Sequence, residues 1–246
     1  MSGIHVAIRE GGQRSALLLH GGGCGGWMWS PLVAELDPGI RLLIPDLPGH
    51  DRSGSIQYRS HDEALDLLIS LIEAEASEPL VVIGFSLGAQ LAILLASRRP
   101  DLVRAVVVIS AQAEPSPFPA PLLAMLGLAA PLARNEGFAR LQAKELFVPE
   151  ALTHDYLRTS RGTTRATLLA SVGENVRFTI PGEWGAFPGR SLILVGAKER
   201  PVMRRSAQRI ADALPGSELE IVADCGHGIP LQKPAWLARR LDGLLE

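Results

Sequence analysis

Ser86 lies in the segment Gly84-Phe85-Ser86-Leu87-Gly88, which fits the pattern G-x-S-x-G that is typical of a nucleophilic serine. The pattern is weak alone, but an apolar run of strand length precedes it at residues 80–83 and a helical pattern begins at Leu87. A sharp strand-to-helix turn exposes the Ser86 hydroxyl at the carboxyl end of a sheet, and the flanking glycines relieve crowding there. The Leu87 amide opens the helix without an intrahelical acceptor, so it can bind a developing oxyanion.

Two more loops follow apolar runs in the same way. His20-Gly21-Gly22-Gly23 follows residues 16–19, and the segment PDLPGHDRS at 45–53 follows residues 41–44. With the serine turn, these loops resemble the α/β-hydrolase superfamily, in which an oxyanion loop and a D-x-P-G-x-G-x-S segment follow the corresponding strands. Asp51 stands where that segment has its second glycine, a departure that concerns the local turn. The resemblance covers nearly the whole chain, and the short N-terminus implies that the first superfamily strand is missing.

The resemblance implies the other members of the site. Its oxyanion loop supplies a second amide, carried here by Gly22. Its Gly-His pair after the last strand corresponds to Gly226-His227, so His227 is the predicted base. Its acid follows the penultimate strand in a G-x-x-D segment, where this chain has Glu199, and the order Ser86, Glu199, His227 is that of the superfamily.

Two other residues compete with Glu199 for the role of the acid. Glu114 comes a few residues after the run at 105–109, where some relatives place their acid, but prolines surround it. Asp224 is three residues before His227 on the same loop, which makes its approach to that imidazole awkward. Glu199 could instead form a surface ion pair with Arg200 or Arg204. The sequence favours Glu199 and leaves these alternatives open.

Apolar runs that alternate with helical patterns predict the elements that hold these residues, and they indicate an α/β fold. We expect a mostly parallel sheet of about seven strands flanked by helices, with Ile4–Arg9 as an edge strand because its residues alternate. Between residues 111 and 190 no strong strand signal occurs, and helical pieces fall at Phe138–Phe147 and Thr153–Ala170. A structureless loop of that length is uncommon in a compact domain. Residues 111–190 are therefore predicted to be an inserted helical cap on a core of residues 1–110 and 191–246.

Composition restricts the classes of partner and the compartment. The 246 residues carry 24 Lys and Arg and 26 Asp and Glu, a formal net charge of −2, which gives no reason to expect nucleic acid. Prolines interrupt the charge-free stretch Pro115–Ala133, so it is expected to be irregular or short-helical and not membrane-spanning. No signal peptide is visible at the N-terminus, and the cytoplasm is the expected location.

The two cysteines, Cys24 and Cys225, match neither a disulfide framework nor a zinc motif. Small buried residues are the expectation for both, and a regulatory thiol or disulfide is the alternative. No metal or organic cofactor is expected.

The resemblance implies nucleophilic acyl transfer to water on a small-molecule substrate. An ester of a small or medium apolar carboxylic acid fits the apolar cap best, with Trp27 and Phe118 as candidate pocket residues. Core packing is the alternative for both side chains. Thioesters, lactones and carbon–carbon bonds are hydrolysed by the same triad, and a ligand receptor on this fold is a further alternative. An intact serine, acid and histidine set argues against the receptor. The oligomeric state is not predicted.

Overall fold

The computed structural model describes residues 3–130 and 135–246, and a seven-stranded sheet forms its centre. The strand order is β1-β3-β2-β4-β5-β6-β7, and only β1 runs antiparallel to its neighbour. The strands are β1 (Val6–Arg9), β2 (Ser15–Leu19), β3 (Arg41–Pro45), β4 (Leu80–Phe85), β5 (Val103–Ile109), β6 (Arg190–Gly196) and β7 (Glu218–Val222). The predicted number of strands and the mostly parallel arrangement are confirmed.

Helices cover both faces of the sheet. The core helices are α1 (Ser30–Val33), α2 (His61–Glu75), α3 (Leu87–Arg98), α8 (Pro201–Asp212), α9 (Ile229–Gln232) and α10 (Pro234–Leu245), with short 3-10 helices at Gly26–Trp29, Asp51–Ser53, Pro100–Leu102, Glu150–Leu152 and Gly182–Ala186. Side chains of β4 alternate between two apolar clusters: Leu80 and Val82 pack towards α2, α3 and α8, whereas Val81 and Ile83 pack towards α1 and α10. A strand buried on both faces explains why β4 is apolar at almost every position.

Local signals determine where several helices begin. The Ser60 hydroxyl accepts from the backbone N–H of Glu63 at the start of α2, and Asp62 and Glu63 occupy the positive end of that helix. α3 begins at Leu87, where the sequence predicts the start of a helix. Proline occupies the first turn of α8 and α10, where its missing N–H costs nothing.

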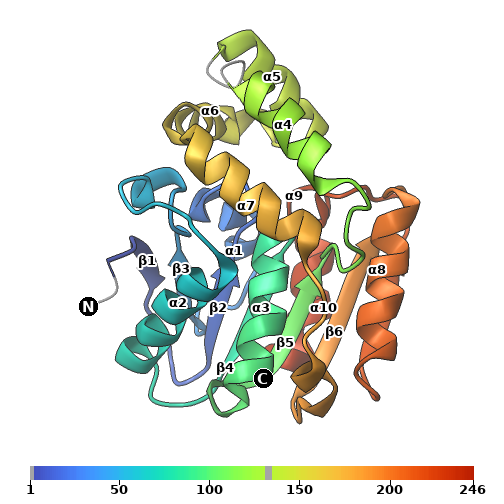
Figure 1. Ribbon diagram of the computed structural model, residues 1–246. Helices are drawn as coiled ribbons and strands as arrows, with labels where there is room; N and C mark the ends of the chain where they lie inside the picture. Colours follow the sequence, from blue (N-terminus) through green and yellow to red (C-terminus); the bar gives the residue numbers. More distant parts are fainter. Residues whose placement is uncertain (1–2, 131–134) are drawn as a thin grey trace.

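In the described part of the chain, four α-helices lie between β5 and β6 and sit together beyond the carboxyl ends of the strands (Figure 1). They are α4 (Pro119–Ala129), α5 (Glu136–Glu145), α6 (Thr153–Gly162) and α7 (Arg165–Arg177). The segment Pro115–Ala133 thus contains an eleven-residue helix, and its residues 131–133 lie outside the described part of the chain. No helix within the described ranges combines the length and the apolar content that a membrane span requires.

The chain returns to the core earlier than the predicted boundary at residue 190. Phe178, Trp184 and Phe187 belong to the apolar cluster beneath α3 and α8, and the Trp184 indole donates to the Ile210 carbonyl at 3.0 Å. Trp184 is fully buried. Helix α7 ends at Arg177, and the residues that follow it bury their aromatic rings in the core.

Candidate active site

Ser86 lies on a strained turn between β4 and α3. Its backbone has φ 53° and ψ −111°, outside the regions that L residues usually adopt. The flanking glycines permit this turn, since a Cβ on Gly84 would lie 2.3 Å from the Gly88 carbonyl oxygen and one on Gly88 would lie 2.2 Å from the Leu19 carbonyl oxygen. The structure thus gives the sequence pattern its physical reason: a side chain at either glycine would collide with backbone.

Three side chains from separate strand ends form one hydrogen-bonded row. The His227 ring lies between Ser86 and Glu199, with Nε2 3.2 Å from Ser86 Oγ and Nδ1 2.7 Å from Glu199 Oε2. Residues 86, 199 and 227 follow β4, β6 and β7, whose carboxyl ends share one edge of the sheet. In this geometry Nδ1 donates its proton to the carboxylate, which leaves Nε2 free to accept from the serine hydroxyl.

The Glu199 carboxylate is buried, and both of its oxygens accept hydrogen bonds. Besides His227, it accepts from Ser110 Oγ at 2.6 Å and from the Gly196 amide at 2.9 Å, both at Oε1. Burial alone would raise the pKa of Glu199, but the hydrogen bonds from His227, Ser110 and Gly196 outweigh it and hold this pKa below its ordinary value of 4.5. The group therefore remains a carboxylate. Ser110 was not predicted, because it reaches Glu199 across 89 residues of sequence through the pairing of β5 with β6.

Neither competing acid reaches the imidazole. Glu114 forms a two-pronged ion pair with Arg205 on α8, with nitrogen–oxygen distances of 2.9 and 3.0 Å. Asp224 is exposed and lies 3.3 Å from the Lys198 ammonium. Among the three acids weighed from the sequence, the structure brings only Glu199 to His227.

The loop after β2 runs against the serine turn. A Cβ on Gly21 would lie 3.4 Å from Ser86 Cβ, and one on Gly22 would lie 3.7 Å from the Leu87 side chain. Gly22, Ser86 and Leu87 all line one cavity. His20 holds this loop, because its Nε2 accepts from the Leu47 amide and its Nδ1 donates to the Gly21 carbonyl, each at 2.8 Å. Complete burial lowers the pKa of His20 to about 4, so the ring is neutral.

The cavity beside Ser86 has a volume of about 740 Å³ and lies between the sheet edge and the four inserted helices. Its α4 wall is apolar, formed by Leu122, Leu126 and Ala129. The remaining wall is mixed, with polar side chains of Gln112, Gln142, Tyr156, Ser160, Thr163, Arg165, Ser171, Asn175 and Arg200. Apolar side chains outside α4 also line the cavity, so the expected hydrophobic character predominates among these polar groups; they are Phe138, Leu146, Leu168, Val172 and Val176. No group of three or more His, Cys, Asp and Glu side chains in the described residues is arranged to hold a metal ion.

The two aromatic residues predicted to line the pocket are not among its lining residues. Trp27 instead packs edge-on against Tyr156 with ring centroids 6.3 Å apart, and its indole donates to Thr159 Oγ1 at 3.0 Å. Phe118 precedes α4 with its side chain 71% exposed. Apolar composition alone could not separate residues that face the cavity from those on the outer surface of the same helices.

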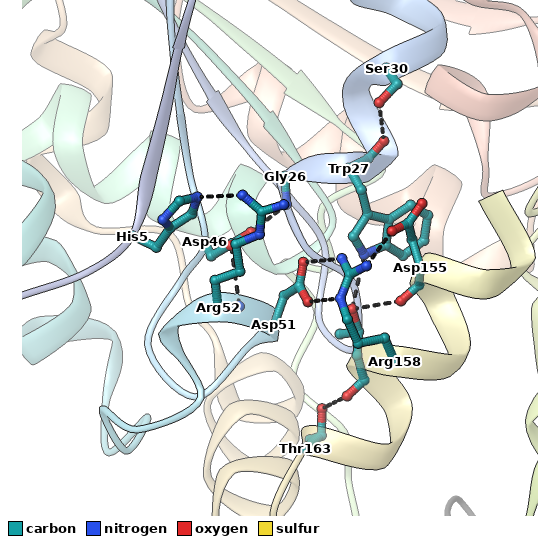
Figure 2. Close-up of polar contacts among 11 residues, drawn as sticks. His5, Gly26, Trp27, Ser30, Asp46, Asp51, Arg52, Asp155, Arg158 and Thr163 are labelled. Carbon is teal, nitrogen blue, oxygen red and sulfur yellow. Dashed lines mark hydrogen bonds and ion pairs between the residues drawn. The ribbon is translucent and has the colours of Figure 1, made fainter.

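Asp51 has a role beyond its local turn. Its carboxylate accepts two hydrogen bonds of 2.9 Å from Arg158 on α6, and the same guanidinium also contacts Asp155 (Figure 2). The Asp51 side chain is only 5% exposed. This bidentate pair, with the nearby Trp27 contact, fixes α6 to the core loop after β3.

The buried side-chain amide of Gln90 links the two chain segments that connect helices α4 to α7 with the rest of the fold. Gln90 on α3 donates to the Gln112 carbonyl at 2.7 Å and to the Asn175 carbonyl at 3.1 Å. Its carbonyl oxygen accepts from His61 Nε2 at 2.9 Å, which orients the amide. Since Gln112 and Asn175 also line the cavity, Gln90 positions both ends of the insertion at the site.

Both cysteines are buried and free. Burial raises the pKa of Cys24 to about 12 and that of Cys225 to about 11. Thiols of this kind are unreactive at neutral pH, in agreement with small packing residues.

Comparison with known proteins agrees with this architecture. The family model described as "Alpha/beta hydrolase family" matches residues 16–240. A pimeloyl-[acyl-carrier protein] methyl ester esterase from Aromatoleum aromaticum is 29% identical, with 89% of this chain and 92% of that protein covered. A solved esterase from Thermogutta terrifontis superposes with a TM-score of 0.79 over 98% of this chain and 93% of its own, at 21% identity.

Some matches are shorter. An AB hydrolase superfamily protein from Gibberella zeae is 40% identical over 101 residues, which cover 39% of this chain and 35% of that protein. A match over so short a stretch says little about the substrate. The match of the family model over most of the sequence, together with the sheet order and the strained serine turn, shows that this chain belongs to the alpha/beta hydrolase family.

Proposed function

We propose that this protein is a serine hydrolase that cleaves carboxylic esters by transferring the acyl group through Ser86 to water. The observation that carries the proposal is the row of Ser86, His227 and Glu199, whose serine lines a cavity. The esterase names of the Aromatoleum aromaticum and Thermogutta terrifontis relatives support the same reaction class.

The reaction proceeds in two halves. His227 Nε2 takes the proton of Ser86 as Oγ attacks the ester carbonyl, and the amides of Gly22 and Leu87 stabilise the oxyanion. The imidazolium, held by the Glu199 carboxylate, then gives that proton to the leaving alcohol, and an acyl-serine remains. Water loses a proton to His227 and attacks the acyl group, after which Ser86 recovers its proton and the carboxylic acid leaves.

The apolar α4 wall suits the hydrocarbon part of a small or medium acyl group, which packs on Leu122 and Leu126. Thioesters and lactones present the same carbonyl to the same groups, so they are the alternative substrates to compare. A receptor without chemistry would have no use for a strained serine turn, whose backbone conformation costs about 1–3 kcal/mol.

A fluorophosphonate probe tests the reaction class directly. The wild-type protein should be labelled once per chain, and Ser86→Ala should not be labelled. Ser70→Ala is the control, because it also removes a serine hydroxyl, one that bonds to the Asp66 carbonyl on α2 and leaves the triad intact. A wild-type protein that resists the probe under conditions that label a known esterase would refute the proposal. A panel of p-nitrophenyl esters, thioesters and lactones of increasing chain length then ranks the substrate classes.

A further inference from the structure

The cavity beside Ser86 carries positive charge that simple ester hydrolysis does not use. Two arginines are among its lining residues: Arg165, the first residue of α7, and Arg200, directly before α8. No Asp or Glu occurs among the described residues that line this cavity. The site therefore has a net positive lining although the whole chain has a formal net charge of −2.

The three acids considered for the triad all have partners outside the cavity. Glu199 is bound to His227, Ser110 and the Gly196 amide. Glu114 is paired with Arg205. Asp224 lies 3.3 Å from the Lys198 ammonium. None of these carboxylates neutralises the two arginines of the cavity.

The guanidinium groups are also free to bind a ligand. Arg165 uses its Nε to donate to the Gly127 carbonyl at 3.0 Å, and it forms no ion pair with the described residues. Arg200 has neither a side-chain hydrogen bond nor an ion pair within residues 3–130 and 135–246. Arg205, one turn further along α8, shows the contrast, because its guanidinium is held by Glu114. Two unpaired like charges at one cavity repel each other, and a bound anion removes that repulsion.

We infer that the substrates of this site are esters that carry an anionic group, a carboxylate or a phosphate, which Arg165 and Arg200 bind while the reacting carbonyl lies at Ser86. The inference rests on the proposed function and narrows its substrate class. Guanidinium groups match the planar oxygens of these anions with paired N–H donors. The hydrocarbon between the anion and the ester would lie on the apolar side chains of the cavity, among them Leu122 and Leu126 of α4.

A pair of esters of equal length tests this inference. Methyl hexanoate and monomethyl adipate have six-carbon acyl chains, and only the second carries a terminal carboxylate. Their hydrolysis is followed as acid release at constant pH, and the readout is the ratio of kcat/KM for the charged ester to that for the neutral one. The ratio cancels any general change in activity. The wild-type ratio should exceed one and should fall as salt is added, because partly exposed charges are screened.

Arg200→Gln should lower the ratio about fivefold, which corresponds to about 1 kcal/mol of lost attraction for a partly exposed pair. Arg165→Gln should lower it similarly, and Arg165→Lys should retain part of the preference because the charge remains. Arg204→Gln is the matched control, since Arg204 is exposed on α8 outside the cavity and should leave the ratio unchanged. The same series with a terminal phosphate in place of the carboxylate shows which anion the two arginines prefer.

Different results separate the two proposals. The inference would be overturned if both esters are hydrolysed and the ratio of their kcat/KM values is equal in wild type, Arg200→Gln and Arg204→Gln. The proposed function would then remain intact. Failure of the wild-type protein to hydrolyse any ester of the series would overturn the proposed function, and the substrate class with it.

Discussion

Replacing Glu199 by glutamine should abolish most of the activity by reversing the tautomer of His227. In the wild-type protein, Oε1 accepts from the Gly196 amide and from Ser110, while Oε2 accepts from His227 Nδ1. The backbone N–H of Gly196 can only donate, so the glutamine oxygen must take the Oε1 position. The glutamine NH2 group then faces Nδ1 across 2.7 Å and needs a lone pair there.

An imidazole with a bare Nδ1 carries its proton on Nε2, the atom 3.2 Å from Ser86 Oγ. It therefore donates to the serine and cannot accept the serine proton. The corresponding amide substitution in a serine protease lowers kcat about 10⁴-fold, which equals about 5 kcal/mol in the activation barrier. We expect a loss of that order, with a thermal unfolding midpoint near that of the wild type because glutamine is nearly isosteric with glutamate.

The assay combines steady-state hydrolysis of a p-nitrophenyl ester with the rate of fluorophosphonate labelling, since both steps need His227 as a base. Glu114→Gln is the matched control, because it makes the same chemical change at a carboxylate bound to Arg205. Full activity in Glu199→Gln, with a large loss in Glu114→Gln, would refute the reasoning and move the acid to the other loop.

Three further changes test how the site is held. Burial lowers the pKa of His20 from an ordinary 6.5 to about 4, so on acidification the unfolded chain takes up this proton before the folded protein does. The free energy of unfolding should therefore fall by about 3 kcal/mol as the pH drops from above 6.5 to below 4. Thermal unfolding of His20→Gln should show a shallower pH dependence. Gly88→Ala places a Cβ 2.2 Å from a backbone oxygen and should destabilise the fold by about 1–3 kcal/mol or more. In the control Gly243→Ala on α10, the new Cβ meets nothing within 4 Å and should stabilise the fold by up to about 1 kcal/mol. Equal effects of the two substitutions in denaturant titrations would contradict the packing argument. Gln90→Met keeps the shape but leaves two carbonyls without a donor, so hydrogen exchange should rise in the segment 112–176 and stay unchanged in the strands; unchanged exchange in that segment would argue against its role at both connections.

Local signals in the sequence were sufficient for most of the core. The serine turn depends on glycines two residues before and after Ser86, and α2 depends on a capping serine directly before it, so both are readable within a short window. Strands buried on both faces are apolar at nearly every position, which made them visible without knowledge of their order.

The position of Glu199 depended on a resemblance, and its environment could not be read at all. The Ser110 hydroxyl that holds its carboxylate is 89 residues away in sequence and reaches it only because β5 and β6 are neighbours in the sheet. The pair of Asp51 and Arg158 spans 107 residues for the same kind of reason. A contact between distant residues is determined by the packing of whole elements, and one sequence records no trace of it.

The inserted helices show this division most clearly. Their apolar composition indicated a pocket lining, yet Phe118, directly before α4, is 71% exposed. Conversely, Arg165 and Arg200 are unremarkable in the sequence, and only the folded chain brings both to one cavity without a counter-charge. The sequence by itself determined the order of strands and helices and the residue types able to do chemistry, because those follow from short-range patterns. The tertiary structure alone decided which side chains face the same space, because that depends on how α4 to α7 pack over the sheet.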